Sequence, residues 1–260
     1  MTMVGASSAD LERAAAALRD ARSVLFITGA GLSADSGLPT YRGIGGLYEA
    51  SDPEEDLPIE TLLSGAMMAS RPELTWTYLA EIARACRGAT FNRGHEVIAE
   101  VERQIERTWT LTQNVDGLHR AAGSKQLIEI HGTLHARRCT ACPWRASVPD
   151  PVPETIPPRC PDCDAIVRPD VVLFNELLPE PAMEVLLREL DRGFDLVFSV
   201  GTSSAFAYII EPVLQATEAG RTTIEINPAP TILSPHVDLR FTGGAASTLD
   251  AIWRRASATP

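Results

Sequence analysis

The chain has 260 residues, of which 45% are hydrophobic and 22% are charged, and its formal net charge is −11. A chain of this length can bury a large core, and its excess negative charge repels nucleic-acid phosphates and anionic lipids. No apolar run approaches the roughly 20 residues of a membrane-spanning helix, and the N-terminus lacks the pattern of a secretory signal. We therefore expect no nucleic acid and no membrane among the partners, and a cytoplasmic location.

Segments rich in helix formers alternate along the chain with short, β-branched apolar segments. We expect helices over residues 10–22, 72–86, 94–104, 181–192, 207–220 and 247–256. We expect strands over residues 23–28, 108–112, 126–131, 170–174, 195–200 and 222–226. This alternation predicts an α/β fold with a Rossmann-type parallel sheet and helices on both faces. The stretches 43–70 and 138–165 break the rhythm and are predicted to be insertions beside the sheet.

Four cysteines have the spacing of a zinc ribbon. Two residues separate Cys139 from Cys142 and Cys160 from Cys163, and 17 residues lie between the pairs. Four thiolates complete a tetrahedral shell with no position for water, so we expect one structural Zn²⁺ ion. Two disulfides or four unrelated thiols are the alternatives, and disulfides are disfavoured in a chain without a secretory signal. The fifth cysteine, Cys86, lies on an apolar helical stripe and is predicted to be a small core residue rather than a nucleophile.

A glycine-rich turn follows the first predicted strand. Gly29, Ala30 and Gly31 precede Ser33, and such small residues allow backbone amides to approach a pyrophosphate. The turn lacks the full three-glycine dinucleotide fingerprint, and a tight turn without a ligand fits the glycines equally well. Tyr41 and Arg42 favour a cofactor, because an aromatic ring can cover a flat cofactor ring and a guanidinium can meet phosphate.

Polar side chains follow two further predicted strands. Gln113, Asn114 and Asp116 come after residues 108–112, where amides and a carboxylate could bind ribose hydroxyls or a carboxamide, although a plain Asx turn is the alternative. His131 ends the strand over 126–131. A histidine at the carboxyl edge of a sheet can act as a general base near neutral pH, although a structural histidine is the commoner case.

Taken together, the motifs of this chain resemble those of the sirtuins, the NAD-dependent protein-lysine deacylases, over residues 23 to about 250. They are, in chain order, GAGLSADSGLPTYRG (29–43), TQNVDGLH (112–119), the histidine of IHGT (130–133), the paired cysteines, GTS (201–203) and EINPAPT (225–231). The resemblance implies a Rossmann-type NAD-binding domain of residues 1–42, 91–137 and 167–260. It implies a cofactor loop and helical module over 43–90, and a zinc ribbon over 138–166.

The resemblance also implies roles for individual residues. His131 would be the general base that acts on the ribose hydroxyls of NAD. The NAD-binding set would be Gly29, Ala30, Gly31, Ser33, Tyr41, Arg42, Gln113, Asn114, Val115, Asp116, Gly201, Thr202, Ser203, Asn227 and Ala245. Gln113 and Asn114 would bind the nicotinamide ribose, and Asp116 the carboxamide.

The implied reaction consumes NAD as a co-substrate. The acyl carbonyl oxygen of a modified lysine attacks C1′ of the nicotinamide ribose as nicotinamide leaves. The 2′ oxygen of the ribose then attacks the resulting imidate carbon, and water releases lysine and O-acyl-ADP-ribose. The partner would be an acyl-lysine protein or peptide, held by strand addition between residues 172–176 and 204–207.

Three positions depart from the family pattern. Tyr41 replaces the usual phenylalanine. Asn175 replaces the glycine of a Phe-Gly-Glu motif, and its side chain is expected to affect which peptides bind. Family members that prefer succinyl or malonyl groups carry a Tyr-x-x-Arg pair, whereas Tyr78 is followed here by Glu81. We therefore expect neutral acyl chains, acetyl or longer aliphatic groups.

Three other functions remain alternatives. A protein mono-ADP-ribosyltransferase would use the same NAD cleft, but has no need of a base for the ribose hydroxyls. A zinc-ribbon adaptor without turnover is disfavoured by the negative charge and by the intact cofactor residues. A nicotinamide dehydrogenase is disfavoured because hydride transfer has no use for the polar turn or the ribbon.

Overall fold

The computed structural model describes residues 7–40 and 57–258, and its centre is a six-stranded parallel sheet. The strand order is β3–β2–β1–β7–β8–β9, and every neighbouring pair is parallel. The strands are β1 (Ser23–Thr28), β2 (Arg107–Thr112), β3 (Leu127–Glu129), β7 (Leu196–Val200), β8 (Thr222–Ile226) and β9 (Leu239–Phe241). The predicted Rossmann-type sheet is thus confirmed.

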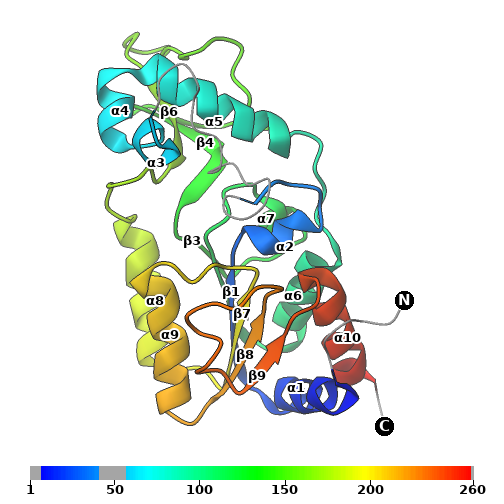
Figure 1. Ribbon diagram of the computed structural model, residues 1–260. Helices are drawn as coiled ribbons and strands as arrows, with labels where there is room; N and C mark the ends of the chain where they lie inside the picture. Colours follow the sequence, from blue (N-terminus) through cyan, green and yellow to red (C-terminus); the bar gives the residue numbers. More distant parts are fainter. Residues whose placement is uncertain (1–6, 41–56, 259–260) are drawn as a thin grey trace.

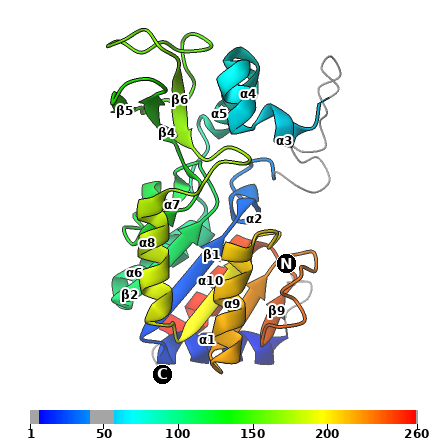
Figure 2. The same ribbon diagram turned by 90° about the vertical axis from the view of Figure 1, so that its left-hand side faces the viewer.

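Helices cover both faces of this sheet (Figures 1 and 2). One face packs against α1 (Ser8–Asp20), α6 (Arg93–Gln104) and α10 (Ala245–Ser257), and the other against α8 (Glu180–Asp191) and α9 (Ala207–Glu218). In β1, Val24 and Phe26 belong to the first core, whereas Leu25 and Ile27 belong to the second. All six residues of β1 are buried, which explains why a strand covered on both faces reads as an unbroken apolar run.

Local sequence explains where the helices begin. The Ser7 side chain accepts a hydrogen bond from the Asp10 backbone amide at the start of α1. Asn92 caps α6, and His95 completes a capping box by accepting from the Asn92 amide. Pro72 occupies the first turn of α5 (Pro72–Cys86), where its missing N–H costs no helical bond.

A smaller unit lies beyond the carboxyl ends of the parallel strands (Figure 2). It contains an antiparallel sheet in the order β5–β4–β6, made of β4 (Gly132–Cys139), β5 (Arg145–Ser147) and β6 (Val167–Val171). Beside it lie α3 (Ile59–Leu62), α4 (Gly65–Ser70) and α5. Trp76 of α5 joins the two parts by donating from Nε1 to the Val167 carbonyl at 2.8 Å.

The segment 170–174 was expected to be a strand of the parallel sheet, and this prediction is wrong. Val167–Val171 instead pairs antiparallel with β4 in the small sheet. An apolar run shows that a strand is buried but does not identify its partner, which is the physical reason for the error. β4 and β6 also extend beyond the predicted ribbon segment 138–166 on both sides. Within the described residues, no helix is long and apolar enough to span a membrane.

Candidate active site

Five of the parallel strands deliver the predicted site residues to one edge of the sheet, where a cavity of about 820 Å³ separates the sheet from the small unit. Its wall includes most of the predicted NAD-binding residues and the predicted base: Gly29, Ala30, Gly31, Gln113, Asn114, Val115, His131, Gly201, Thr202, Ser203, Asn227 and Ala245. Such a position, beyond the carboxyl ends of parallel strands, is where open α/β sheets bind ligands. Tyr41 and Arg42 lie outside the described residues.

The glycine turn before α2 (Ala30–Ala34) is bonded to the end of β7. The Gly29 amide donates to the Val200 carbonyl at 3.0 Å, and the Gly31 amide donates to the Gly201 carbonyl at 2.8 Å. These two amides thus have partners within the protein, and contact of this turn with a diphosphate stays a prediction. The small size of both glycines allows two loops to pack together at the cavity wall.

Amide side chains tie the loops of the cavity wall to one another. Gln113 Nε2 donates to Thr202 Oγ1 at 2.7 Å, and Asn227 Nδ2 donates to the Thr202 carbonyl at 2.7 Å. Asn114 Nδ2 donates to the Gly29 carbonyl at 3.0 Å and to Ser33 Oγ at 3.1 Å. Since Gln113 and Asn114 use their nitrogens in this way, their side-chain oxygens are the atoms suited to accept from ribose hydroxyls.

Ser33 and Asp116 meet in a smaller pocket that shares Ala30 and Asn114 with the large cavity. Ser33 Oγ donates to Asp116 Oδ2 at 2.6 Å, and Asp116 Oδ1 accepts from the Leu118 amide at 2.9 Å. Burial raises the pKa of Asp116, while the Ser33 hydrogen bond opposes this shift. A buried, oriented carboxyl group of this kind suits the recognition of an amide NH₂ group.

His131 was predicted to end the strand over 126–131, but β3 ends at Glu129 and His131 lies in the turn between β3 and β4. Its Nδ1 is 3.1 Å from the Gln113 carbonyl and its Nε2 is 2.7 Å from the Tyr208 hydroxyl. A carbonyl oxygen only accepts, so Nδ1 carries the proton and Nε2 is the basic nitrogen. Burial lowers the pKa of His131, which keeps the imidazole neutral at physiological pH and able to accept a proton.

Two buried histidines, His95 and His119, lie behind the polar turn, and the sequence-based analysis gave them no role. His119 Nε2 is 2.9 Å from Thr28 Oγ1, which donates to Thr112 Oγ1 at 2.9 Å, and Thr112 Oγ1 accepts from the Asn114 amide. The His95 ring meets the His119 ring edge to face at 4.9 Å. Burial lowers the pKa of both, to about 4 for His95. No local signal marks His119, since its partner Thr28 lies on another element, and the local bond of His95 to the Asn92 amide does not reveal its contact with His119.

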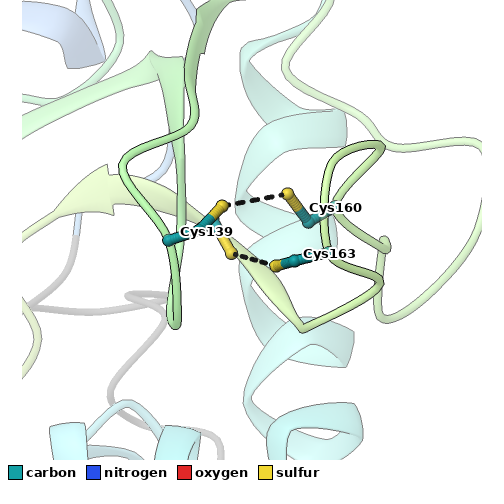
Figure 3. A group of neighbouring side chains, drawn as sticks. Cys139, Cys160 and Cys163 are labelled. Carbon is teal, nitrogen blue, oxygen red and sulfur yellow. Dashed lines mark hydrogen bonds between the residues drawn. The ribbon is translucent and has the colours of Figure 1, made fainter.

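The four paired cysteines converge in the small unit. Their sulfur atoms all lie within 4.8 Å of one another. Figure 3 shows Cys139 on one segment, facing Cys160 and Cys163 on a second. The Cys139–Cys163 and Cys142–Cys160 sulfurs are 3.5 and 3.6 Å apart, far longer than a disulfide bond. Tetrahedral zinc with Zn–S bonds of about 2.3 Å requires sulfurs about 3.8 Å apart, so the cluster fits a structural zinc ion.

The fifth cysteine is not part of this cluster. Cys86 packs partly buried against the core of the small unit, and burial raises the pKa of its thiol to about 12. A thiol with this pKa is protonated at neutral pH and is a poor nucleophile, in line with the sequence-based prediction.

Comparison with known proteins gives the family. Residues 29–207 match the model of the Sir2 family. The chain is 49% identical over 249 residues to "NAD-dependent protein deacylase 2" of Pseudomonas aeruginosa, covering 95% of this chain and 97% of that protein.

Two solved structures extend the comparison. The fold superposes on a Sir2 homologue in complex with NAD with a TM-score of 0.85 and 32% identity, over 98% of this chain and 96% of the other. It also superposes on a Sir2 complex with a p53 peptide and NAD⁺ with a TM-score of 0.80 and 26% identity, over 94% and 97% of the two chains.

A parallel sheet with a cavity at its carboxyl edge and a four-cysteine cluster beside it defines a dinucleotide-dependent enzyme with a structural zinc site. The chain belongs to the Sir2 family of NAD-dependent protein deacylases, the sirtuins. NAD is thus its co-substrate, and proteins or peptides are its substrates.

Proposed function

We propose that this deacylase transfers acetyl and longer neutral aliphatic groups from lysine to ADP-ribose, with His131 as the general base. NAD supplies the electrophilic C1′ of its nicotinamide ribose and receives the acyl group. The observation that carries the proposal is the position of the His131 ring in the cavity wall. Its Nδ1 donates to the Gln113 carbonyl, so Nε2 carries the lone pair, and burial lowers the pKa of the ring and keeps it neutral. This nitrogen takes a proton from a ribose hydroxyl after nicotinamide has left.

The residues around this base bind and orient the dinucleotide. Gln113 and Asn114, fixed by their amide nitrogens, present oxygens to the nicotinamide ribose. Asp116 receives the carboxamide in the smaller pocket, where Ser33 fixes its carboxyl group. Thr202 and Ser203 after β7, Asn227 after β8 and Ala245 at the start of α10 surround the adenosine. We also assign Tyr41 and Arg42 to the NAD-binding site, because the sequence resemblance to the sirtuins implies it.

The acyl group is proposed to lie in the part of the cavity formed by the small unit. That wall is apolar and carries Leu63, Leu79, Ile82, Leu134, Val171 and Leu173. An aliphatic chain gains about 0.8 kcal/mol per buried CH₂ against such a wall, whereas an acidic acyl group would lose its hydration there. Glu81, on which the sequence-based argument for neutral chains relied, is exposed and absent from the wall. The apolar lining therefore replaces Glu81 as the reason for neutral acyl preference.

The peptide is proposed to add as a strand beside residues 172–176. One edge of this segment is already paired, because the Phe174 amide donates to the Leu63 carbonyl and the Phe174 carbonyl accepts from the Gly65 amide. On the opposite edge, the Leu173 amide and carbonyl are bonded to the Glu176 carboxylate and amide, so the peptide is proposed to pair with the Asn175 backbone and with residues 204–207. Asn175 has φ 64°, in the left-handed region that asparagine tolerates better than most residues, so the backbone keeps a glycine-like conformation here. Glu176 fixes the end of the segment through Arg168 at 2.5 and 2.8 Å.

Mass spectrometry of acetyl-lysine peptides, incubated with the purified protein with and without NAD, tests this proposal. We expect deacetylation only with NAD, together with O-acetyl-ADP-ribose, and slower removal of succinyl than of propionyl groups. His131→Ala should reduce deacylation to a small residual rate and retain NAD binding, while His236→Ala, which changes an exposed histidine, serves as the control. ADP-ribose attached to protein without loss of acyl groups would instead support a mono-ADP-ribosyltransferase.

A further inference from the structure

Tyr208 contacts the basic nitrogen of His131, although neither the sequence motifs nor the proposed mechanism assigns it a role. Its hydroxyl lies 2.7 Å from His131 Nε2, and both side chains line the large cavity. Since Nδ1 of His131 donates to the Gln113 carbonyl, Nε2 has only a lone pair, and the phenol must be the donor. The imidazole is therefore held at both of its nitrogens.

The position of Tyr208 is itself fixed by an aromatic cluster at the start of α9. The Tyr208 ring stacks on Phe206 with 5.4 Å between centroids and an interplanar angle of 10°. The His131 ring stands edge-on to both rings, at 6.1 Å from Phe206 and 6.0 Å from Tyr208. Burial raises the pKa of Tyr208 to about 12, so the phenol carries its proton across the working pH range.

We propose that Tyr208 is a positioning residue for the general base, whose hydroxyl holds the His131 ring with Nε2 directed into the cavity until a ribose hydroxyl replaces it. This inference rests on the proposed role of His131. Without the hydroxyl, the ring retains only its bond to Gln113 and can pivot about it. A hydrogen bond donated to the neutral imidazole also disfavours protonation, so its loss should raise the pKa of His131.

The carboxylates Glu129 and Asp170, on the strands that flank His131, are each paired with arginine and do not compete for this role. Glu129, on the strand that precedes His131, is 2.6 Å from Arg120. Asp170, on the neighbouring strand β6, pairs with Arg138 at 3.1 Å and with Arg145 at 2.7 Å. Among the described residues, Tyr208 is thus the titratable group that contacts the ring directly.

Tyr208→Phe tests the proposal, because it keeps the stacked ring and removes one oxygen atom. We expect kcat/KM for deacylation to fall by about tenfold, with NAD–nicotinamide exchange changed by less than about twofold, since exchange precedes the step that needs the base. The acid limb of the pH profile should move to higher pH. Thr217→Val, which removes a hydroxyl from α9 outside the cavity, should leave kcat/KM, the exchange rate and the pH profile unchanged.

A double mutant separates positioning from a structural role. In a His131→Ala background, Tyr208→Phe should cause no further loss of residual deacylation, because the hydroxyl acts through the imidazole. An unchanged rate and pH profile in the single mutant, or additive losses in the double mutant, would overturn the proposal. An NMR titration of His131 needs no turnover: its pKa should be higher in Tyr208→Phe. If the wild-type enzyme proved inactive, the proposed function would fail while this titration still decided whether the contact tunes the histidine.

Discussion

Gly31 and Gly201 lie so close together that a Cβ atom added to Gly31 would be 2.7 Å from the Gly201 Cα atom. The approach is mutual, since a Cβ atom on Gly201 would lie 2.5 Å from the Leu32 amide nitrogen. Two turns, one after β1 and one after β7, therefore pack backbone to backbone at the wall of the large cavity, the proposed NAD site. Neither turn can accept a larger residue without moving the other.

Gly31→Ala should accordingly weaken both the fold and NAD binding. We expect a loss of about 1–3 kcal/mol in the free energy of unfolding, the usual cost of overpacking, and a higher Kd for NAD. Chemical denaturation and calorimetric titration with NAD measure the two effects. The control is Gly220→Ala, where the added Cβ atom meets nothing within 4 Å but φ is 68°. That variant should lose stability through its backbone alone, with an unchanged Kd.

Asp116→Asn should impair recognition of the nicotinamide end of NAD. The asparagine side chain places an NH₂ donor where one carboxylate oxygen of Asp116 accepts a hydrogen bond from the carboxamide. The KM for NAD should therefore rise by about tenfold, which corresponds to the loss of one charge-assisted hydrogen bond. Inhibition by free nicotinamide should weaken in parallel. Asp191→Asn, at an exposed position ending α8, is the matched control. An unchanged KM together with unchanged inhibition would contradict this role.

Removal of zinc should unfold the small unit. Because four thiolates hold the ion, Cys139→Ser or a strong chelator should lower the zinc content and the melting temperature together. Metal analysis should find one zinc per chain in the wild type. Cys86→Ser should keep its zinc, since Cys86 lies outside the cluster. Retention of full zinc content and stability in Cys139→Ser would contradict a structural metal.

The buried histidine pair should make the fold sensitive to acid. His95 has a pKa of about 4 in the native state because it is buried, against about 6.5 when unfolded, so the unfolded chain binds more protons below pH 6.5. The free energy of unfolding should therefore decrease as pH falls from about 6.5 to 4, by up to about 3 kcal/mol for this residue. Denaturant titrations at several pH values measure the slope.

His95→Gln provides the comparison for that slope. Glutamine at the third position of a helix can still accept from the capping residue, so the start of α6 is preserved while the titrating group is removed. The variant should show a shallower loss of stability in acid than the wild type. Equal slopes would show that His95 is not responsible.

Much of this protein follows from local sequence. The glycine turn and the polar turn each come directly after a buried strand, His131 follows the edge strand β3 by two residues, and parallel strands bring such positions to one edge whatever their order. The cysteine spacing likewise predicts the cluster, because each pair forms its own half of the metal site.

Other features depend on which elements pack together. The strand β6 was assigned to the wrong sheet because its partner, β4, is not encoded in its own pattern. Glu81 was expected near the acyl group, but the rotation of α5 against the core turns Leu79 and Ile82 toward the cavity and Glu81 toward solvent.

Sequence alone thus determined the chemical groups and the strand ends that carry them, because these follow from short-range patterns. The tertiary structure alone decided how those groups are oriented. Tyr208 and His131 are 77 residues apart and come from a helix and the turn after β3, and only the packing of α9 on the sheet places the phenol on the basic nitrogen. Contacts of this kind depend on the relative positions of whole elements, which local patterns do not specify.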